Sequence, residues 1–158
     1  MQDKNAKLLY RGSRDGYRAS DFHSKCDGKK NQLTLIKSES GRIFGGYQSK
    51  PRISPPVGDW KSSDDKSAFI FSVSDQKKFP VSNSKKAIQD IDSFGPTFGN
   101  FDILIYDNCN LTSQNRTDFG DSYSIPDELK LESDENAKSY LAGSNEFKVV
   151  EIEVFALI

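Results

Sequence analysis

The sequence has few of the residues from which catalytic and metal sites are most often built. Its 158 residues include one histidine, His23, and two cysteines, Cys26 and Cys109. A structural zinc site takes four nitrogen, sulfur or oxygen ligands, and these three residues cannot supply them without several carboxylates. We therefore predict no metal and no cofactor. The two cysteines can form at most one disulfide bridge, and a reducing compartment would keep both as thiols.

The sequence also lacks a long apolar run and an excess of one charge. No segment approaches the roughly 20 apolar residues that span a bilayer, and MQDKNAKLLYRG (1–12) lacks the apolar stretch of a signal peptide. Lys and Arg number 22 against 23 Asp and Glu, so the net charge is -1. Neutralisation of phosphates, which drives nucleic-acid binding, is not favoured by this balance. We expect a soluble, cytoplasmic protein that binds no nucleic acid and does not insert into a membrane.

The length and the apolar content fit one folding unit. A domain commonly has about 100–200 residues, and 35% of this chain is hydrophobic. A single domain of this size buries enough apolar surface to fold without a disulfide or a metal. We expect one monomeric domain over 1–158.

Apolar residues alternate with a period of two in several short segments, which is typical of β-strands. Turn residues at 39–41 predict a hairpin between 32–38 and 41–49. Gly45 and Gly46 interrupt the second strand, which indicates a bulge or a close backbone approach. The segments 67–74 and 101–107 are apolar on both faces and resemble central strands covered on two sides. The other strands are expected at 8–11 and 147–157, the latter being the longest.

Helical signals are fewer. Ser20 or Asp21 can cap a short helix that places Phe22 and Cys26 on one face and ends at Gly28. The segment 84–95 is consistent with either a helical turn or an irregular strand. Long loops are expected at 49–67 and, with one helical turn, at 109–139. The pattern predicts an α+β, β-rich fold: two antiparallel sheets packed as a sandwich, with a few short peripheral helices.

Cys26 is the redox candidate. His23 precedes it by three residues on the predicted helix, so the two side chains can meet, and an imidazole can lower the pKa of a thiol. Cys26 also shares the inward face with Phe22, and a buried cysteine is usually an inert apolar residue. We expect the inert thiol.

Glu151 and Glu153 are the candidates for acid–base chemistry. Two residues apart on a strand, they share a face with Cα atoms about 6.5 Å apart. This spacing falls within the range of glycoside hydrolases, so a hydrolase with paired glutamates is the alternative enzyme hypothesis. An alternating Glu/apolar strand is more often a solvated or ion-paired face, and we expect no enzyme.

Two further regions are candidates for interaction. In YRGSRDGY (10–17), Arg11 and Asp15 could form a tight turn, or the arginines could bind an anion. Trp60 lies in the loop 49–67, where it could anchor a protein partner or plug the end of the sandwich. The interaction candidates are thus Trp60, Glu151, Glu153, Arg11 and Asp15.

Seven ordered pieces of the sequence, covering almost all of it, resemble the TLDc domain, a module shared by oxidation-resistance proteins and several proteins with TBC, LysM or EF-hand modules. The pieces are LLYRGSRDG (8–16), FHSKCDG (22–28), LTLIKSESGRIFGGYQS (33–49), Trp60, AFIFSV (68–73), FGPTFGNFDILIYDNCN (94–110) and YLAGSNEFKVVEIEVF (140–155).

This resemblance implies two antiparallel sheets packed as a sandwich with helices around the edge. It also implies association with protection from oxidative stress and with the vacuolar-type proton ATPase, whose assembly some members regulate. The expected function is a non-enzymatic protein-interaction module, with ATPase subunits as candidate partners. The recurrent positions of the family fall here on Gly12, Phe22, Cys26, Gly45, Gly46, Trp60, Gly95, Gly143, Glu151 and Glu153.

Overall fold

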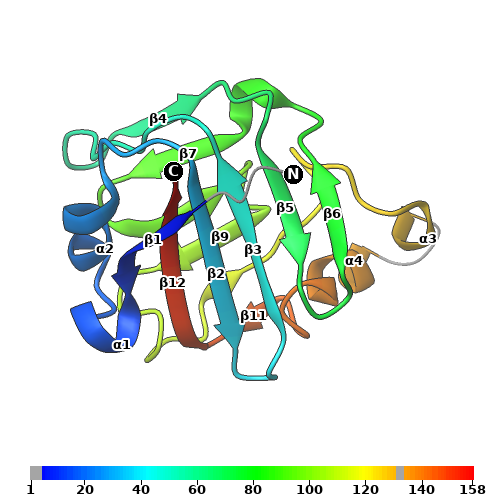
Figure 1. Cartoon of the computed structure of the whole chain (residues 1–158). Coiled ribbons are helices and arrows are strands. Elements are labelled where there is room, and N and C mark those ends of the chain that lie inside the picture. The colour runs from blue at the N-terminus through cyan, green and yellow to red at the C-terminus, as the bar shows by residue number, and fades with distance from the viewer. Residues whose placement is uncertain (1–4, 131–133) are drawn as a thin grey trace.

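Two antiparallel sheets of six strands each form the body of the protein (Figure 1). The computed structural model describes residues 5–130 and 134–158. The first sheet has the strand order β1 (Ala6–Arg11), β12 (Val149–Leu157), β2 (Gln32–Ser38), β3 (Ile43–Gln48), β5 (Phe69–Ser72) and β6 (Lys77–Pro80). The second has the order β11 (Glu146–Phe147), β10 (Asn115–Arg116), β9 (Ile103–Tyr106), β8 (Phe94–Phe98), β7 (Ile88–Ile91) and β4 (Trp60–Ser63).

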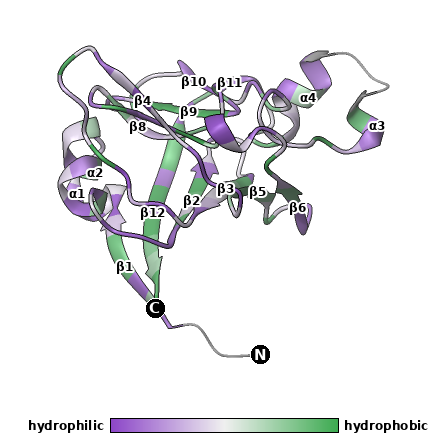
Figure 2. Ribbon diagram, turned by 90° about the horizontal axis from the view of Figure 1, so that it is seen from above, coloured by the Kyte–Doolittle hydropathy of each residue, from purple (hydrophilic) through white to green (hydrophobic). Residues whose placement is uncertain are grey.

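Short helices lie at the two ends of these layers (Figure 2). At one end are α1 (Gly12–Asp15) and α2 (Ala19–Cys26), and at the other are α3 (Asp127–Lys130) and α4 (Asp134–Tyr140). The predicted fold class, two antiparallel sheets with few peripheral helices, is confirmed. The single helical turn expected in 109–139 is wrong, because α3 and α4 both fall there; residues 131–133 lie outside the described residues.

The core fills the space between the sheets. Phe44 of β3 meets Phe147 of β11 edge to face, with ring centroids 5.7 Å apart. Along β12, Ile152 and Val154 are buried, while Glu151 and Glu153 alternate with them and stay partly exposed. The period of two therefore places both glutamates on the outer face of the first sheet, as the sequence predicts.

The predicted hairpin is β2–β3, and its glycines mark a close approach instead of a bulge. Its register is continuous from Gln32 opposite Gln48 to Lys37 opposite Ile43. A Cβ atom on Gly46 would lie 2.6 Å from the ring of Phe98 in the second sheet. Only a residue without a side chain lets the sheets pack this closely here.

Of the two strands predicted to be covered on both sides, one is confirmed and one is not. Residues 101–107 contain β9, whose Ile103, Leu104 and Ile105 are all buried, as expected for a covered strand. Residues 67–74 contain β5, but its Phe69 and Phe71 are only half-buried, so the expectation of cover on both sides is wrong there. The segment 84–95 combines both alternatives, a 3₁₀ turn (Ser84–Lys86) followed by β7 and the start of β8.

The helix α2 (Ala19–Cys26) begins two to three residues earlier than expected. Its N-cap is Arg18, not Ser20 or Asp21. The Asp21 carboxylate accepts the Arg18 N–H at 3.1 Å, and the Asp107 carboxylate accepts the Ala19 N–H at 2.8 Å. Gly28 follows the helix with a φ of 76°, a conformation that glycine adopts at no steric cost.

Candidate functional site

Both candidate glutamates lie beside the junction of β1 and α1. Arg11, at the end of β1, is opposite Glu153 of β12, and its Nε donates to Glu153 Oε1 at 2.7 Å. Glu151 Oε1 accepts the N–H of Ser13 in α1 at 3.1 Å and the N–H of Ile152 at 3.0 Å. The Glu153 carboxylate thus faces a guanidinium, and the Glu151 carboxylate faces two backbone N–H donors.

This arrangement does not favour the hydrolase alternative. A carboxylate pair that acts on a substrate must reach it, whereas Glu153 is already bound by the Arg11 guanidinium at 2.7 Å and Glu151 by backbone N–H groups. The glutamates border a pocket of about 190 Å³ whose apolar lining comes from Leu35, Ile36 and Ile43. The geometry is that of charged residues at the edge of an apolar surface.

An apolar row crosses the whole first sheet beside these charges. Six side chains face outward and lie opposite one another from strand to strand: Leu8, Phe155, Leu33, Tyr47, Phe69 and Pro80. Five are half-buried and Pro80 is exposed. With neighbouring strands about 4.8 Å apart, this apolar row is about 24 Å long. Within the described parts of the chain no helix covers it (Figure 1).

Aromatic contacts order the β6 end of the apolar row. The rings of Tyr47 and Phe69 stack with centroids 5.1 Å apart, and Lys78 Nζ lies 4.0 Å from the Phe69 ring centroid. Rigid aromatic side chains with a polar rim are typical of protein-interaction surfaces. The sequence contains each of these residues, but only strand pairing across the sheet reveals that they form one surface.

Trp60 lies on a different face. It is the first residue of the edge strand β4, and its side chain is 51% exposed. Its ring contacts Phe101 edge to face at 5.5 Å and Phe94 at 6.2 Å. The alternative in which Trp60 plugs the sandwich core is therefore wrong.

Arg11 and Asp15 do not pair through their side chains. Asp15 binds the Arg14 guanidinium at 2.7 Å and the Arg11 N–H at 2.9 Å. The hydrogen bond from Arg14, followed by that from Arg11, lowers the pKa of Asp15 to about 2. The RGSRDG segment is a short helical corner in which the Asp15 carboxylate is already paired with Arg14. This fits the interpretation as a tight turn better than that as an anion site.

The thiols are buried. Cys26 is 0% exposed, and burial raises its pKa to about 12 although Arg52 acts in the opposite direction. Burial also raises the pKa of Cys109 to about 12. Both thiols are therefore protonated and shielded at neutral pH, which favours the inert role over the redox role.

His23 contacts other partners than Cys26. Its Nδ1 lies 2.8 Å from Asp27 Oδ1, and its Nε2 lies 2.9 Å from the carbonyl oxygen of Phe94 and 3.0 Å from that of Ile91. Asp27, four residues after His23, was the available sequence signal for the first contact. Nothing local in the sequence indicates the two carbonyls.

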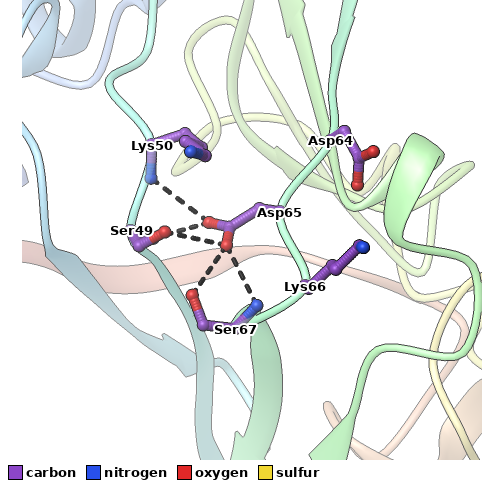
Figure 3. Close-up of a pocket in the computed structure, with 6 residues that line it drawn as sticks. All are labelled: Ser49, Lys50, Asp64, Asp65, Lys66 and Ser67. Carbon is purple, nitrogen blue, oxygen red and sulfur yellow. Dashed lines mark hydrogen bonds between the residues drawn. The ribbon is translucent and has the colours of Figure 1, made fainter.

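A cavity of about 450 Å³ lies between the loops that follow β3 and β4 (Figure 3). Its buried acid, Asp65, accepts five hydrogen bonds, from the N–H and Oγ of Ser49, the N–H of Lys50, and the N–H and Oγ of Ser67. Burial raises the pKa of Asp65, but these bonds outweigh it and lower the pKa overall. Asp65 thus joins two loop ends, and both of its carboxylate oxygens are engaged in these hydrogen bonds.

The described residues contain no cluster of three or more His, Cys, Asp or Glu that could hold a metal ion. No helix among them is long and apolar enough to cross a bilayer.

Comparison with known families identifies the chain. A family model described as the TLDc domain matches residues 1–158. No curated protein sequence matches the chain significantly. The model covers the whole chain, and the two-sheet architecture agrees with the fold that the resemblance implies. The chain belongs to the TLDc domain family.

Proposed function

We propose that this domain is a non-enzymatic protein-interaction module that binds a protein partner with the outer face of its first sheet. The observation that carries the proposal is the apolar row from Leu8 to Pro80, which is solvent-accessible on all six strands. Single exposed apolar residues are ordinary, but a contiguous apolar surface commonly marks an interaction site.

The charges beside the apolar row favour a partner with basic residues. The contacts of Glu151 and Glu153 with Ser13, Ile152 and Arg11 are made by Oε1, so a further donor on a partner can bind Oε2. Complementary charges at the edge of an interface increase the association rate and make binding sensitive to salt. We expect weaker binding at higher ionic strength.

Family membership supports a role in protection from oxidative stress, and within that role we propose subunits of the vacuolar-type proton ATPase as partners. Protection would then act through assembly of a complex, because both thiols of this chain are buried. Function resides in surfaces and not in folds, so the partner must be tested directly.

The test is affinity capture of ATPase subunits from lysate of the source cell. The baits are the wild-type domain, a Glu151→Lys/Glu153→Lys variant and a Tyr47→Asp variant in the apolar row. Lys61→Glu on β4 is the matched control, because Lys61 is exposed on the other sheet. We expect the wild type and the control to recover ATPase subunits and both other variants to lose them.

The two parts of the proposal fail separately. Equal capture by all four baits would show that the surface is wrong. Capture without any ATPase subunit would show that the partner is wrong. Circular dichroism of each variant checks that the fold is kept.

A further inference from the structure

His23 is held at a point where one helix meets a turn of the second sheet. Its side chain is 6% exposed. The Asp27 carboxylate contacts its Nδ1 from the same helix, and the carbonyl oxygens of Ile91 and Phe94 contact its Nε2. Ile91 ends β7 and Phe94 begins β8, so the histidine holds both sides of the two-residue turn between them.

All three partners are acceptors, so the hydrogen bonds can form together only when both ring nitrogens donate. That requires the imidazolium form, because a neutral imidazole has one N–H. When the ring loses one proton, a lone pair is left on one of its nitrogens. A lone pair on Nδ1 beside the charged Asp27 carboxylate is higher in energy than a lone pair on Nε2 beside two neutral carbonyl oxygens. The neutral ring therefore keeps its Nδ1–H, and its Nε2 lone pair faces the oxygens of Ile91 and Phe94.

The same two residues position Trp60. Trp60 is the direct partner of Ile91 in the pairing of β4 with β7, and its ring packs against Phe94. A change in the turn between Ile91 and Phe94 must therefore reach the exposed indole.

We propose that His23 is a proton-dependent latch: its protonated ring holds the turn between β7 and β8 and fixes Trp60, and deprotonation releases both. The latch is the set of three hydrogen bonds that His23 makes. It joins α2 to the second sheet and so goes beyond the interaction surface proposed for the first sheet.

The charged groups around the latch favour its protonated form. Asp27 faces the ring from α2, and Asp90 acts on it from β7. Arg52, from the loop after β3, is paired with Asp90 at 3.1 Å, and Phe94–Phe98 of β8 carries no charge. The turn between β7 and β8 itself carries one further acid, Asp92. Burial lowers the pKa of His23, yet the bonds to Asp27, Phe94 and Ile91 outweigh burial and raise it above its usual value.

The sequence makes a direct experiment available, since it contains one histidine and one tryptophan. Proton NMR of the imidazole and the fluorescence of the indole are recorded on the full chain from about pH 5 to pH 9. We expect both signals to titrate with one midpoint, above the unperturbed histidine value of about 6.5. In His23→Gln we expect the indole transition to be lost.

Two variants separate this latch from other causes. Burial raises the pKa of Asp102 to about 6. Asp102 directly follows Phe101, whose ring contacts Trp60, so its titration could also affect the indole. Asp102→Asn must leave the indole transition in place. Asp27→Asn must shift the imidazole and indole midpoints together to lower pH, which serves as the test if His23→Gln does not fold.

An indole signal that stays constant while His23 titrates would overturn the proposal. A transition that persists with the same midpoint in His23→Gln would also overturn it.

Discussion

Arg11 Nε donates to Glu153 Oε1 at 2.7 Å across the paired strands β1 and β12. The Arg11 side chain is 43% exposed and that of Glu153 is 23% exposed, so water screens this ion pair. Ion pairs of this kind contribute about 0–1 kcal/mol to stability. The contact orders the corner beside the proposed interaction surface more than it stabilises the fold.

Replacement of Glu153 with Gln tests this assessment. We predict that Glu153→Gln lowers the free energy of unfolding by less than about 1 kcal/mol, because the amide oxygen still accepts a hydrogen bond from Arg11. Urea denaturation measures the change, with Lys61→Gln on an exposed edge strand as the control. A loss of about 3 kcal/mol or more would contradict a screened pair.

A methyl group at Gly46 should destabilise the sandwich. Its Cβ would lie 2.6 Å from the Phe98 ring, so either the ring or one of the sheets must shift. Overpacking of this type costs about 1–3 kcal/mol. We predict that loss for Gly46→Ala in urea denaturation.

The control for Gly46→Ala is Phe98→Leu, which makes room at the same contact. The double variant should lose less stability than the sum of the two single losses, because the new methyl group no longer meets the ring. Simple additivity would show that the contact with Phe98 is not the cause.

The stability of the fold should depend on pH through His23. Its pKa is raised in the folded state, by bonds that outweigh burial. A raised pKa means that the stabilisation is complete below the unfolded value of about 6.5 and is lost as pH rises through the folded value. We predict that the difference in unfolding free energy between wild type and His23→Gln decreases as the pH rises from the unfolded pKa of His23 through its folded pKa.

Urea denaturation at a series of pH values measures that difference. Asp102 titrates in both proteins and cancels in the subtraction. A difference that is constant from pH 5 to pH 9 would be inconsistent with a proton on His23.

The buried thiols should be unreactive in the folded protein. Cys26 and Cys109 are 0% and 2% exposed, and burial raises the pKa of each to about 12. We predict that a thiol-specific reagent labels neither cysteine under native conditions and labels both in denaturant.

A second measurement, the consumption of hydrogen peroxide, tests direct scavenging by the thiols. The purified domain should consume no hydrogen peroxide, with Cys109→Ser as the comparison for Cys26→Ser. Consumption that Cys26→Ser abolishes and Cys109→Ser retains would establish Cys26 as a redox residue.

The sequence alone determined the features that depend on local periodicity and local turns. Alternation in 147–157 placed Glu151 and Glu153 on one face, and the turn at 39–41 predicted the β2–β3 hairpin. Helical spacing put Phe22 and Cys26 on one buried face. These features are determined by neighbours in the chain, and the ordered family segments implied the same two-sheet architecture as the period of two.

Tertiary structure alone decided the short strands and the contacts of the candidate residues. The strands β6 (KKFP) and β8 (FGPTF) contain lysine, proline or glycine and have no strand pattern of their own, yet pairing with neighbours stabilises them. His23 finds its carbonyls 68 and 71 residues away, and Arg11 meets Glu153 across 142 residues. A local period carries no information about which distant segments pair, because that choice depends on how the two sheets bury apolar surface together.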